Sequence, residues 1–476
     1  MLEEPDPVLE QPGPVLEQPD PILAKAAREC LKSLAFPEMQ TRSLEISTAV
    51  EGTCRWLLEH STYKRWAACD HGLLWIKGKP GSGKSTLMKY ALGRQLEGRD
   101  GNTLVLSFFF HDRGNTLQKS ALGFVRSLVH QLLDQAPDAL SDLVHTFDKR
   151  RENHGEPGSA WHWHEEELWL ALVSSLPKVL KTRSVCCFVD ALDEGGKDTA
   201  VELVEKFKSA VEGLRRHPTG LSPFRICFSC RHYPIVDLDQ AAFEICAEEE
   251  NPRDISAFVD DRLAAFSART SSTIPTLIAK RASGVFMWAR LVVKQVLDLE
   301  LEGKGLQSIK AAINAIPPEL DDLYRQLIRD MDPASLKLIQ WISFAERPLD
   351  MDELRWAMFL EGNSPHQSLR ACESHQDYVP DNAQMKRQVQ TLSRGLAEVA
   401  EGPYWQDVQF IHQSVKDFFV DRGLLMLDAG CATQSEAVVA AHFRLAKICI
   451  GFLSLEEIRL ASEDSKSRPP FWSPLS

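Results

Sequence analysis

Five short, almost continuously apolar runs recur in the first half of the chain, separated by stretches with helical periodicity. Such runs differ from the alternating pattern of a half-exposed strand, because a strand in a parallel sheet is covered by helices on both faces. The pattern therefore predicts an α/β fold built on a parallel sheet. We expect its strands at Leu73–Ile76, Thr103–His111, Ser184–Asp190, Phe224–Cys230 and Ala242–Ala247.

The chain before these runs has other patterns. Residues 5–25 repeat an imperfect heptad with proline at two positions each time, which excludes a regular helix or a central strand. We therefore expect residues 1–25 to form a disordered, proline-rich leader. Residues 26–70 predict a helical lead-in that packs beside the sheet, because apolar residues recur there at helical spacing. This stripe consists of Ile46, Val50, Cys54 and Leu57.

Two further stretches also differ from the strand pattern. Residues 136–166 are mostly polar and predict an exposed insertion between the second and third strands. Residues 254–315 contain only helical patterns, which predicts a small helical bundle. Asp350 stands three residues before Glu353, a variant of the capping box, so we expect a helix to begin there and to end near Leu360.

A glycine-rich segment, KGKPGSGKST at Lys77–Thr86, lies between the first expected strand and a helical pattern over Ser85–Leu92. Its glycines allow positive φ, so that main-chain N–H groups and the helix N-terminus can face phosphate oxygens. Lys84 is expected to contact the β- and γ-phosphates and to take part in catalysis, and the Ser85 hydroxyl to hold Mg²⁺. The strand before it and the helix after it favour this interpretation over an ordinary turn. The expected phosphate ligands are Gly78, Pro80, Gly81, Ser82, Gly83, Lys84, Ser85 and Thr86.

The third expected strand ends in carboxylates, in VCCFVDALDE. Asp190 stands at its carboxyl end, where α/β sheets bind ligands, and is expected to hold Mg²⁺ together with Ser85. Asp193 and Glu194 follow, and either could orient and deprotonate an attacking water, a choice that spacing leaves open. Arg231 ends the fourth strand and is a catalytic candidate that could contact a γ-phosphate, although pairing with a local carboxylate is the alternative.

Composition narrows the class of protein. A chain of 476 residues needs two to four domains, and no apolar run of about eighteen residues or secretory signal is visible, so we expect a cytoplasmic protein. A net charge of −13 argues against nucleic acid or an anionic membrane as the main partner. Eleven cysteines suit reduced thiols. Cys227 and Cys230 form a C-x-x-C, but on a strand they point to opposite faces, so metal binding by this pair is not expected.

Several motifs together resemble one family. LLWIKGKPGSGKST, FVDALDE, FSCRHYP, SGVFMWARLVV, IPPELDDLY, RPLDMDELRWAM and VQFIHQSVKDFF follow one another between about Leu34 and Phe419. In this order they resemble the fungal NACHT-domain proteins, which are signal-transduction (STAND) ATPases with a nephrocystin-type P-loop domain and are related to NOD-like receptors. The ordered series is more specific than any single motif.

The resemblance implies a domain layout and further ligands. It implies a NACHT P-loop NTPase domain at 71–250, a small helical domain at 251–315 and a winged-helix domain at 316–425. In related receptors a winged-helix histidine contacts the β-phosphate of ADP, which implies this role for His412, although a structural histidine is the alternative. Phe286 stands near the place where relatives often have a proline against adenine, so the adenine contact stays open. Residues 426–476 are expected to be a helical segment that begins a missing or truncated module.

Residues and resemblance together predict an ATP/ADP-binding, Mg²⁺-dependent signalling switch. In this hypothesis weak, slow ATP hydrolysis resets a chain whose ATP form associates with itself or with other signalling proteins. Two alternatives are a small-molecule P-loop kinase, because the same glycine motif opens those enzymes, and a scaffold that holds its nucleotide permanently. No motif in the sequence identifies the upstream trigger or the downstream effector of such a switch.

Overall fold

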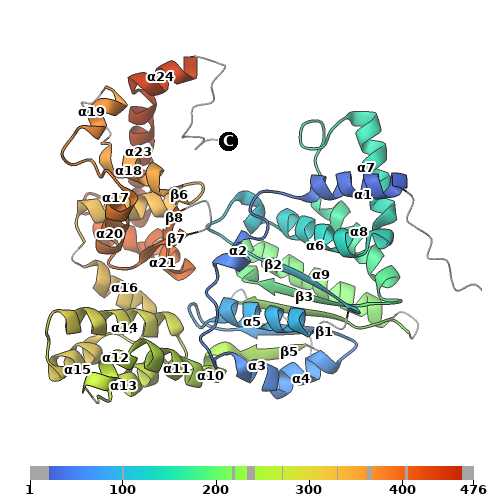
Figure 1. The fold of residues 1–476 in the computed structure, drawn as a ribbon, viewed down its shortest axis with the longest axis horizontal. Helices are drawn as coiled ribbons and strands as arrows, with labels where there is room; N and C mark the ends of the chain where they lie inside the picture. Colours follow the sequence, from blue (N-terminus) through green and yellow to red (C-terminus); the bar gives the residue numbers. More distant parts are fainter. Residues whose placement is uncertain are drawn as a thin grey trace, which may run out of the picture.

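The computed structural model describes residues 21–98, 101–216, 220–232, 242–270, 272–329, 331–361, 367–401 and 406–463. An α/β unit occupies one side of the molecule, and two largely helical units stack on its other side (Figure 1). This agrees with the predicted α/β fold, in which a parallel sheet is followed by a helical region.

The sheet of the α/β unit has five parallel strands in the order β2-β3-β4-β1-β5. Because all strands run the same way, their carboxyl ends meet at one edge. The third and fourth strands have the predicted bounds, and the others differ from their predictions by one or two residues at one or both ends. The strands are β1 (His71–Lys77), β2 (Thr103–Phe109), β3 (Ser184–Asp190), β4 (Phe224–Cys230) and β5 (Phe243–Cys246).

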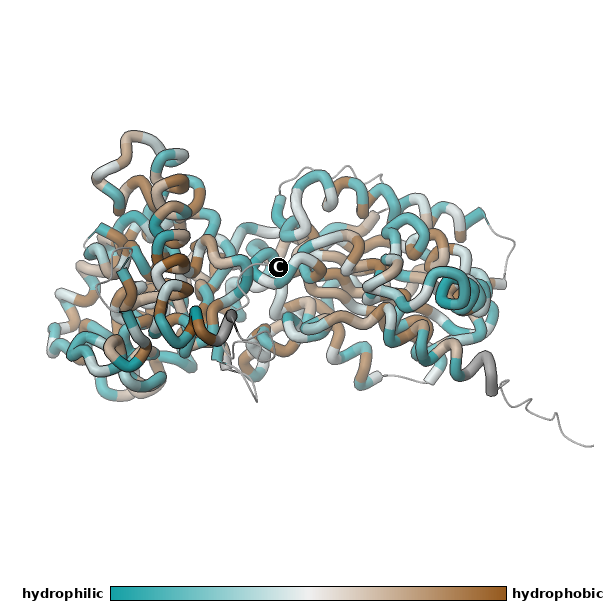
Figure 2. The backbone as a smooth tube through the Cα atoms, turned by 90° about the horizontal axis from the view of Figure 1, so that it is seen from above, coloured by the Kyte–Doolittle hydropathy of each residue, from teal (hydrophilic) through white to brown (hydrophobic). Residues whose placement is uncertain are grey.

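Both faces of this sheet are covered, which explains the continuous apolar runs. In β1, Leu73 and Trp75 belong to one buried cluster, while Leu74 and Ile76 belong to another on the opposite face. Figure 2 shows the hydrophobic strands gathered inside the unit and the hydrophilic helix faces outside. The first face is covered by helices that include α6 (Ala121–Gln135), α8 (Glu165–Val179) and α9 (Lys197–Arg215), and the second by α5 (Lys84–Glu97) and part of the lead-in.

The lead-in differs from its prediction at both ends. Helix α1 already begins at Pro21, because proline is compatible with the first turn of a helix, so residues 21–25 are not part of an irregular leader. Residues 1–20 lie outside the described part of the chain. The expected stripe from Ile46 to Leu57 is not one helix, since Ile46 is extended and Cys54 has a φ of 63°. The helices are α1 (Pro21–Leu34), α2 (Thr41–Glu45), α3 (Arg55–Glu59) and α4 (Ser61–Ala68).

The stretch between β2 and β3 is not the expected exposed insertion. After a 3₁₀ turn at Pro137–Leu140 it forms α7 (Ser141–His154), which packs against α1. Phe147 of this helix is buried, and Trp163 stacks on it with ring centroids 6.3 Å apart. The polar composition misled the prediction because one narrow apolar face is enough to dock a helix.

The second half of the chain forms two connected units that share one apolar core. The described residues 247–329 form only helices: α10 (Ala247–Glu250), α11 (Pro252–Arg262), α12 (Ala264–Thr270), α13 (Ile274–Ala282), α14 (Phe286–Leu301), α15 (Leu306–Ala315) and α16 (Leu320–Ile328). None of the helices that the structure describes is both long and apolar enough to cross a membrane.

The last unit, which we call the C-terminal unit, surrounds a small antiparallel sheet in the order β6-β8-β7. Asp350 caps α18 as predicted, because its Oδ1 accepts from Asp352 N at 2.8 Å and its N–H donates to Glu353 at 3.0 Å. The elements are α17 (Pro333–Phe344), β6 (Leu349–Asp350), α18 (Met351–Phe359), α19 (Leu369–Glu373), α20 (Asn382–Leu392), β7 (Ala397–Glu401), β8 (Gln406–Phe410), α21 (Gln413–Phe418), a π turn at Phe419–Gly423, α22 (Leu424–Leu427), α23 (Gln434–Leu453) and α24 (Glu456–Glu463).

Candidate nucleotide site at the carboxyl edge of the sheet

The glycine-rich segment forms the turn between β1 and α5 at the carboxyl edge. Gly81 and Gly83 have φ of 74° and 91°, which side chains rarely adopt. Lys84 opens α5, and its Nζ donates to the carbonyls of Gly78 at 2.8 Å and Lys79 at 3.0 Å. Burial lowers the pKa of Lys84. The lysine therefore lies inside its own loop, where an anion would find a cation with little water around it.

The loop is packed from outside by the helical units, which sequence reasoning did not anticipate. Met287 N donates to Gly81 O at 3.0 Å. Asn251 Nδ2 donates to Ser82 O at 2.7 Å and to Gly284 O at 3.0 Å, so one amide ties the loop to the turn before α14. These contacts join residues far apart in sequence. Gly284 and Met287 lie in the SGVFMWARLVV motif, whereas Asn251 lies in no motif.

Asp190, at the end of β3, is fully buried. Its Oδ1 accepts from Ser229 Oγ at 2.6 Å, whereas Oδ2 has no hydrogen-bond partner among the described residues. Burial raises the pKa of this carboxyl, and the nearby hydroxyls of Ser229 and Ser85 oppose the rise. A buried carboxylate oxygen without a partner, beside a serine hydroxyl, fits a divalent cation with oxygen ligands. Ser85 and Asp190 are therefore suited to hold Mg²⁺, which would neutralise phosphate charge.

The two acidic residues that follow have different surroundings on a 3₁₀ turn, Leu192–Gly195. Asp193 pairs with Arg231, with Oδ2 3.0 Å from Nε and Oδ1 accepting from the backbone N at 3.2 Å. Glu194 accepts from Asp112 N at 3.1 Å. Burial raises the pKa of Glu194 to about 7, against the charges of Arg42 and Arg113. A carboxylate that titrates near neutral pH suits a general base, so these surroundings favour Glu194 over Asp193 for that role.

Arg231 also connects the sheet edge to the C-terminal unit. Its Nη1 lies 2.7 Å from Asp417 Oδ2 on α21. Beside it, Gln413 Nε2 donates to Asp112 at 2.7 Å, and Lys416 Nζ lies 3.2 Å from the same carboxylate. We call these five residues the polar seam. Only Arg231 among them was predicted as a site residue. Gln413, Lys416 and Asp417 lie in the VQFIHQSVKDFF motif, which by itself assigns them no role, and Asp112 lies in no motif.

His412 lies next to the seam, at the N-cap of α21. Its Nδ1 accepts from Ser414 N at 3.0 Å, which leaves the proton of a neutral imidazole on Nε2. Burial, and then the charges of Arg113, Lys84 and Arg231, hold the pKa of His412 well below its usual value. The ring is therefore a neutral hydrogen-bond donor close to a group of cations. A structural cap and a phosphate ligand are both compatible with this geometry.

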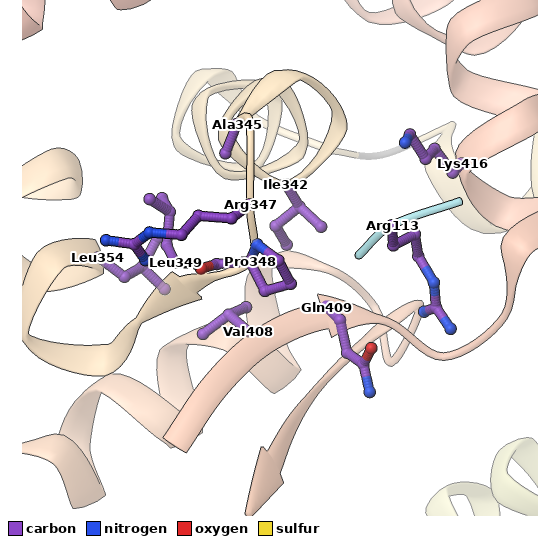
Figure 3. Close-up of a pocket in the computed structure, with 10 residues that line it drawn as sticks. All are labelled: Arg113, Ile342, Ala345, Arg347, Pro348, Leu349, Leu354, Val408, Gln409 and Lys416. Atoms are coloured by element: carbon purple, nitrogen blue, oxygen red, sulfur yellow. Dashed lines mark hydrogen bonds between the residues drawn. The ribbon is translucent and has the colours of Figure 1, made fainter. Parts of the chain in front are cut away.

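A separate pocket lies between Arg113 of the α/β unit and the C-terminal unit, which supplies the other lining residues. Figure 3 shows Ile342, Pro348 and Val408 between Arg347 on one side and Arg113 on the other. None of the expected phosphate ligands lines it. This pocket is therefore separate from the candidate nucleotide site.

The segment that contains this site matches a known protein family. Residues 52–231 match the family described as Nephrocystin 3, N-terminal. The vegetative incompatibility protein HET-E-1 of Podospora anserina is 24% identical over 418 residues, which is 82% of this chain and 28% of that protein. The chain thus spans less than a third of the length of this relative.

Two solved structures resemble the fold more distantly. One is a signal transduction ATPase with numerous domains (STAND) protein with a tetratricopeptide repeat sensor from Pyrococcus horikoshii, with 14% identity, a TM-score of 0.38, and coverage of 84% of this chain and 46% of that one. The other is the ORC2 protein of Aeropyrum pernix in ADPNP–ADP complexes, with 12% identity, a TM-score of 0.31, and coverage of 88% and 98%.

Proposed function

We propose that this chain is a NACHT-related P-loop NTPase of the STAND class and acts as an ATP/ADP switch, in which the C-terminal unit responds to the nucleotide at the sheet edge. The match of residues 52–231 to the nephrocystin family supports this proposal. ADP would accompany the closed arrangement of the units. ATP would favour an open arrangement that exposes surfaces for assembly, and slow hydrolysis would return the chain to the closed form.

The observation that carries this proposal is the shared arginine. Arg231 holds Asp193, next to the candidate metal site, and Asp417 on α21. Both arginine and aspartate are partly exposed, at 28% and 34% of their side-chain surface, so the pair can be exchanged for another partner. One guanidinium therefore links the place where a γ-phosphate would bind to the element that would have to move.

The residues suggest how the switch would operate. Lys84 and the turn of Gly81 and Gly83 would bind the phosphates, and Ser85 with Asp190 would hold the metal ion. Arg231 would leave Asp417 for a γ-phosphate, because a phosphate oxygen accepts a bidentate guanidinium at least as well as a carboxylate. Asp417 would then have lost its cation, and α21 would be held to the edge only by the remainder of the polar seam.

The magnitudes allow such a switch. Moving a two-state population from 1:99 to 99:1 takes about 5.5 kcal/mol of differential binding. Hydrogen bonds to charged groups contribute roughly 1.5 to 3 kcal/mol each. Two or three charged interactions with one additional phosphate, from Lys84, the metal ion and Arg231, together with the loss of the Asp417 ion pair, are therefore sufficient.

Hydrolysis would serve as the reset in this proposal. Glu194 is the candidate that would take a proton from the attacking water, since its pKa of about 7 leaves it partly ionised at neutral pH. Its neighbours Arg42 and Arg113 favour the ionised form. While Arg231 is paired with Asp417 it cannot also stabilise the transferring phosphate, which would keep turnover slow in the closed form.

The test starts from the full chain as purified. Its bound nucleotide is identified, and mass by light scattering and phosphate release are then measured with ATP, with ADP and in Lys84→Ala. We expect bound ADP, ATP-driven assembly, and loss of both in Lys84→Ala. Rapid transfer of phosphate to an added small-molecule acceptor would instead indicate a kinase. ADP that never exchanges, without assembly, would indicate a locked scaffold.

A further inference from the structure

A second group of ligand-type side chains stands at the base of the P-loop, on the side opposite the candidate magnesium site. His232 follows the end of β4, Cys246 ends β5, and Glu248 lies in α10. One imidazole nitrogen of His232, the Sγ of Cys246 and a carboxylate oxygen of Glu248 all lie within 4.8 Å of one another. They come from three different elements, so their proximity is a tertiary feature and not a product of sequence spacing.

The parallel sheet explains why they meet. Strand β1 lies between β4 and β5, and its last residue, Lys77, is opposite both Cys230 and Cys246. His232 stands two residues beyond Cys230, and Glu248 stands two residues beyond Cys246. The three donors therefore straddle the first residues of the P-loop, which leave the sheet at this point.

The donor set and its geometry fit a metal ion. Imidazole nitrogen, thiolate sulfur and carboxylate oxygen are the ligands that Zn²⁺ takes in proteins, with three protein ligands leaving a fourth position for water. His232 Nε2 lies 2.5 Å from Glu248 Oε1. Tetrahedral zinc with bonds of about 2.0 to 2.3 Å separates its donors by roughly 3.3 to 3.6 Å. Side-chain movements of about 1 Å would therefore suffice, with no change in the strands.

The surroundings also suit a cation. The His232 side chain is 45% exposed and gives the site access to solvent, whereas Glu248 is only 11% exposed and fixed by a second contact. Burial and the charge of Glu248 raise the pKa of Cys246 to about 12, so the metal-free residue is a thiol. Metal binding would release that proton and place the thiolate charge against the ion.

We propose that His232, Cys246 and Glu248 form a Zn²⁺ site that braces the base of the P-loop. Glu248 uses Oε1 for His232, and its Oε2 accepts from the backbone N of Lys79 at 3.2 Å. A zinc ion on Oε1 therefore leaves the contact with the P-loop in place and fixes the carboxylate that makes it. His232 directly follows Arg231, so the ion would also restrain the strand end that carries this arginine.

The C-x-x-C motif is not part of this site. Cys227 is fully buried with its Sγ 3.7 Å from Met88 Sδ, and Cys230 is buried on the opposite face of the sheet. The relevant cysteine belongs instead to β5, which has no second cysteine nearby in sequence.

The test uses Co²⁺ as a spectroscopic probe on the nucleotide-free full chain, followed by Zn²⁺ competition. We expect the chain to bind one equivalent of Co²⁺ and to show a thiolate-to-metal charge-transfer band. Added Zn²⁺ should displace the Co²⁺ and remove this band. Because loss of a residue that only orients a ligand costs 10- to 100-fold in affinity, His232→Gln and Cys246→Ser are expected to weaken Zn²⁺ binding by more than about 100-fold. His232 is 45% exposed, so its replacement removes little packing, and a melting curve of His232→Gln checks that the variant is folded.

Two controls decide the location of the ion. Cys449→Ser, which removes a half-buried thiol from α23, should leave the band unchanged. Asp190→Asn should also leave it unchanged, since that carboxylate belongs to the candidate magnesium site. A Co²⁺ spectrum without a thiolate band, a band that persists in Cys246→Ser, or a band lost in Asp190→Asn would each overturn the proposal. None of these results depends on whether the chain is a switch.

Discussion

Replacing Asp417 by asparagine tests whether the ion pair with Arg231 holds the closed arrangement. The substitution removes one charge and keeps the size of the side chain. Hydrogen bonds between charged groups contribute about 1.5 to 3 kcal/mol, and exposed ion pairs about 1 kcal/mol or less. Because each partner is about a third exposed, with the contact at 2.7 Å, we take about 1.5 kcal/mol. This corresponds to a roughly tenfold shift towards the open arrangement.

The assay is the release of a fluorescent ADP analogue after mixing with excess ADP. We expect Asp417→Asn to release it roughly ten times faster than the natural chain. Asp321→Asn is the matched control, because it removes the Arg422–Asp321 pair at 3.1 Å, which joins α16 to the π turn and includes no residue of the α/β unit. A double-mutant cycle with Arg231→Gln isolates the pair itself. Unchanged ADP release in a folded Asp417→Asn protein, or zero coupling in the cycle, would refute the latch.

Three further predictions concern the sheet edge. The raised pKa of Glu194, about 7, implies that the folded chain holds this proton more tightly than the unfolded chain, so stability falls as pH rises from about 4.5 to 7. Glu194→Gln should therefore stabilise the chain more at pH 8 than at pH 5, and should abolish a rise of single-turnover hydrolysis centred near pH 7, whereas the exposed control Glu97→Gln should do neither. If Glu194→Gln changed the melting temperature equally at pH 5 and pH 8, the raised pKa of Glu194 would be contradicted. Gly83→Ala places a Cβ 3.1 Å from an aromatic ring of α14 at a φ of 91°, so we expect a loss of about 1 to 2 kcal/mol and of ADP binding. Gly93→Ala, with open space around it, should be neutral or stabilising by about 0.5 to 1 kcal/mol in the same melting and calorimetric experiments. Asp190→Asn should raise the Mg²⁺ concentration needed for nucleotide binding on the order of 100-fold, and an unchanged Mg²⁺ requirement would remove Asp190 from the metal site.

Part of this architecture could be derived from local patterns. The strand over Ser184–Asp190 is predictable because burial on both faces requires an apolar residue at each position, and its terminal carboxylate follows from the same string of letters. The P-loop turn is equally local, since the φ values of Gly81 and Gly83 depend on the absence of a side chain. The capping of α18 by Asp350 also involves residues only three apart.

The misleading patterns have a common cause. Ile46 and Leu57 belong to a stripe with helical spacing, yet the chain between them is not one helix. The buried carboxylate of Asp254 binds the backbone in the middle of this stretch instead. Asp254 Oδ2 accepts from Cys54 N at 2.7 Å and from Trp56 Nε1 at 3.0 Å, some two hundred residues away, and Cys54 takes a left-handed conformation. Periodicity reports which residues are buried, and not which hydrogen bonds compete for the backbone.

The sequence by itself determined the parallel sheet, the glycine turn and the acidic strand end, because each depends on residues close together in the chain. Only the tertiary structure decided what faces them. Gln413 donates a hydrogen bond to Asp112, which is 301 positions away in the chain. Arg231 pairs with both Asp193 and Asp417. His232 lies close to Cys246 and Glu248, on the other side of the strand that precedes the P-loop. The strength of such contacts depends on distance and burial in the folded chain, and neither quantity has a counterpart in the spacing of residues along a sequence.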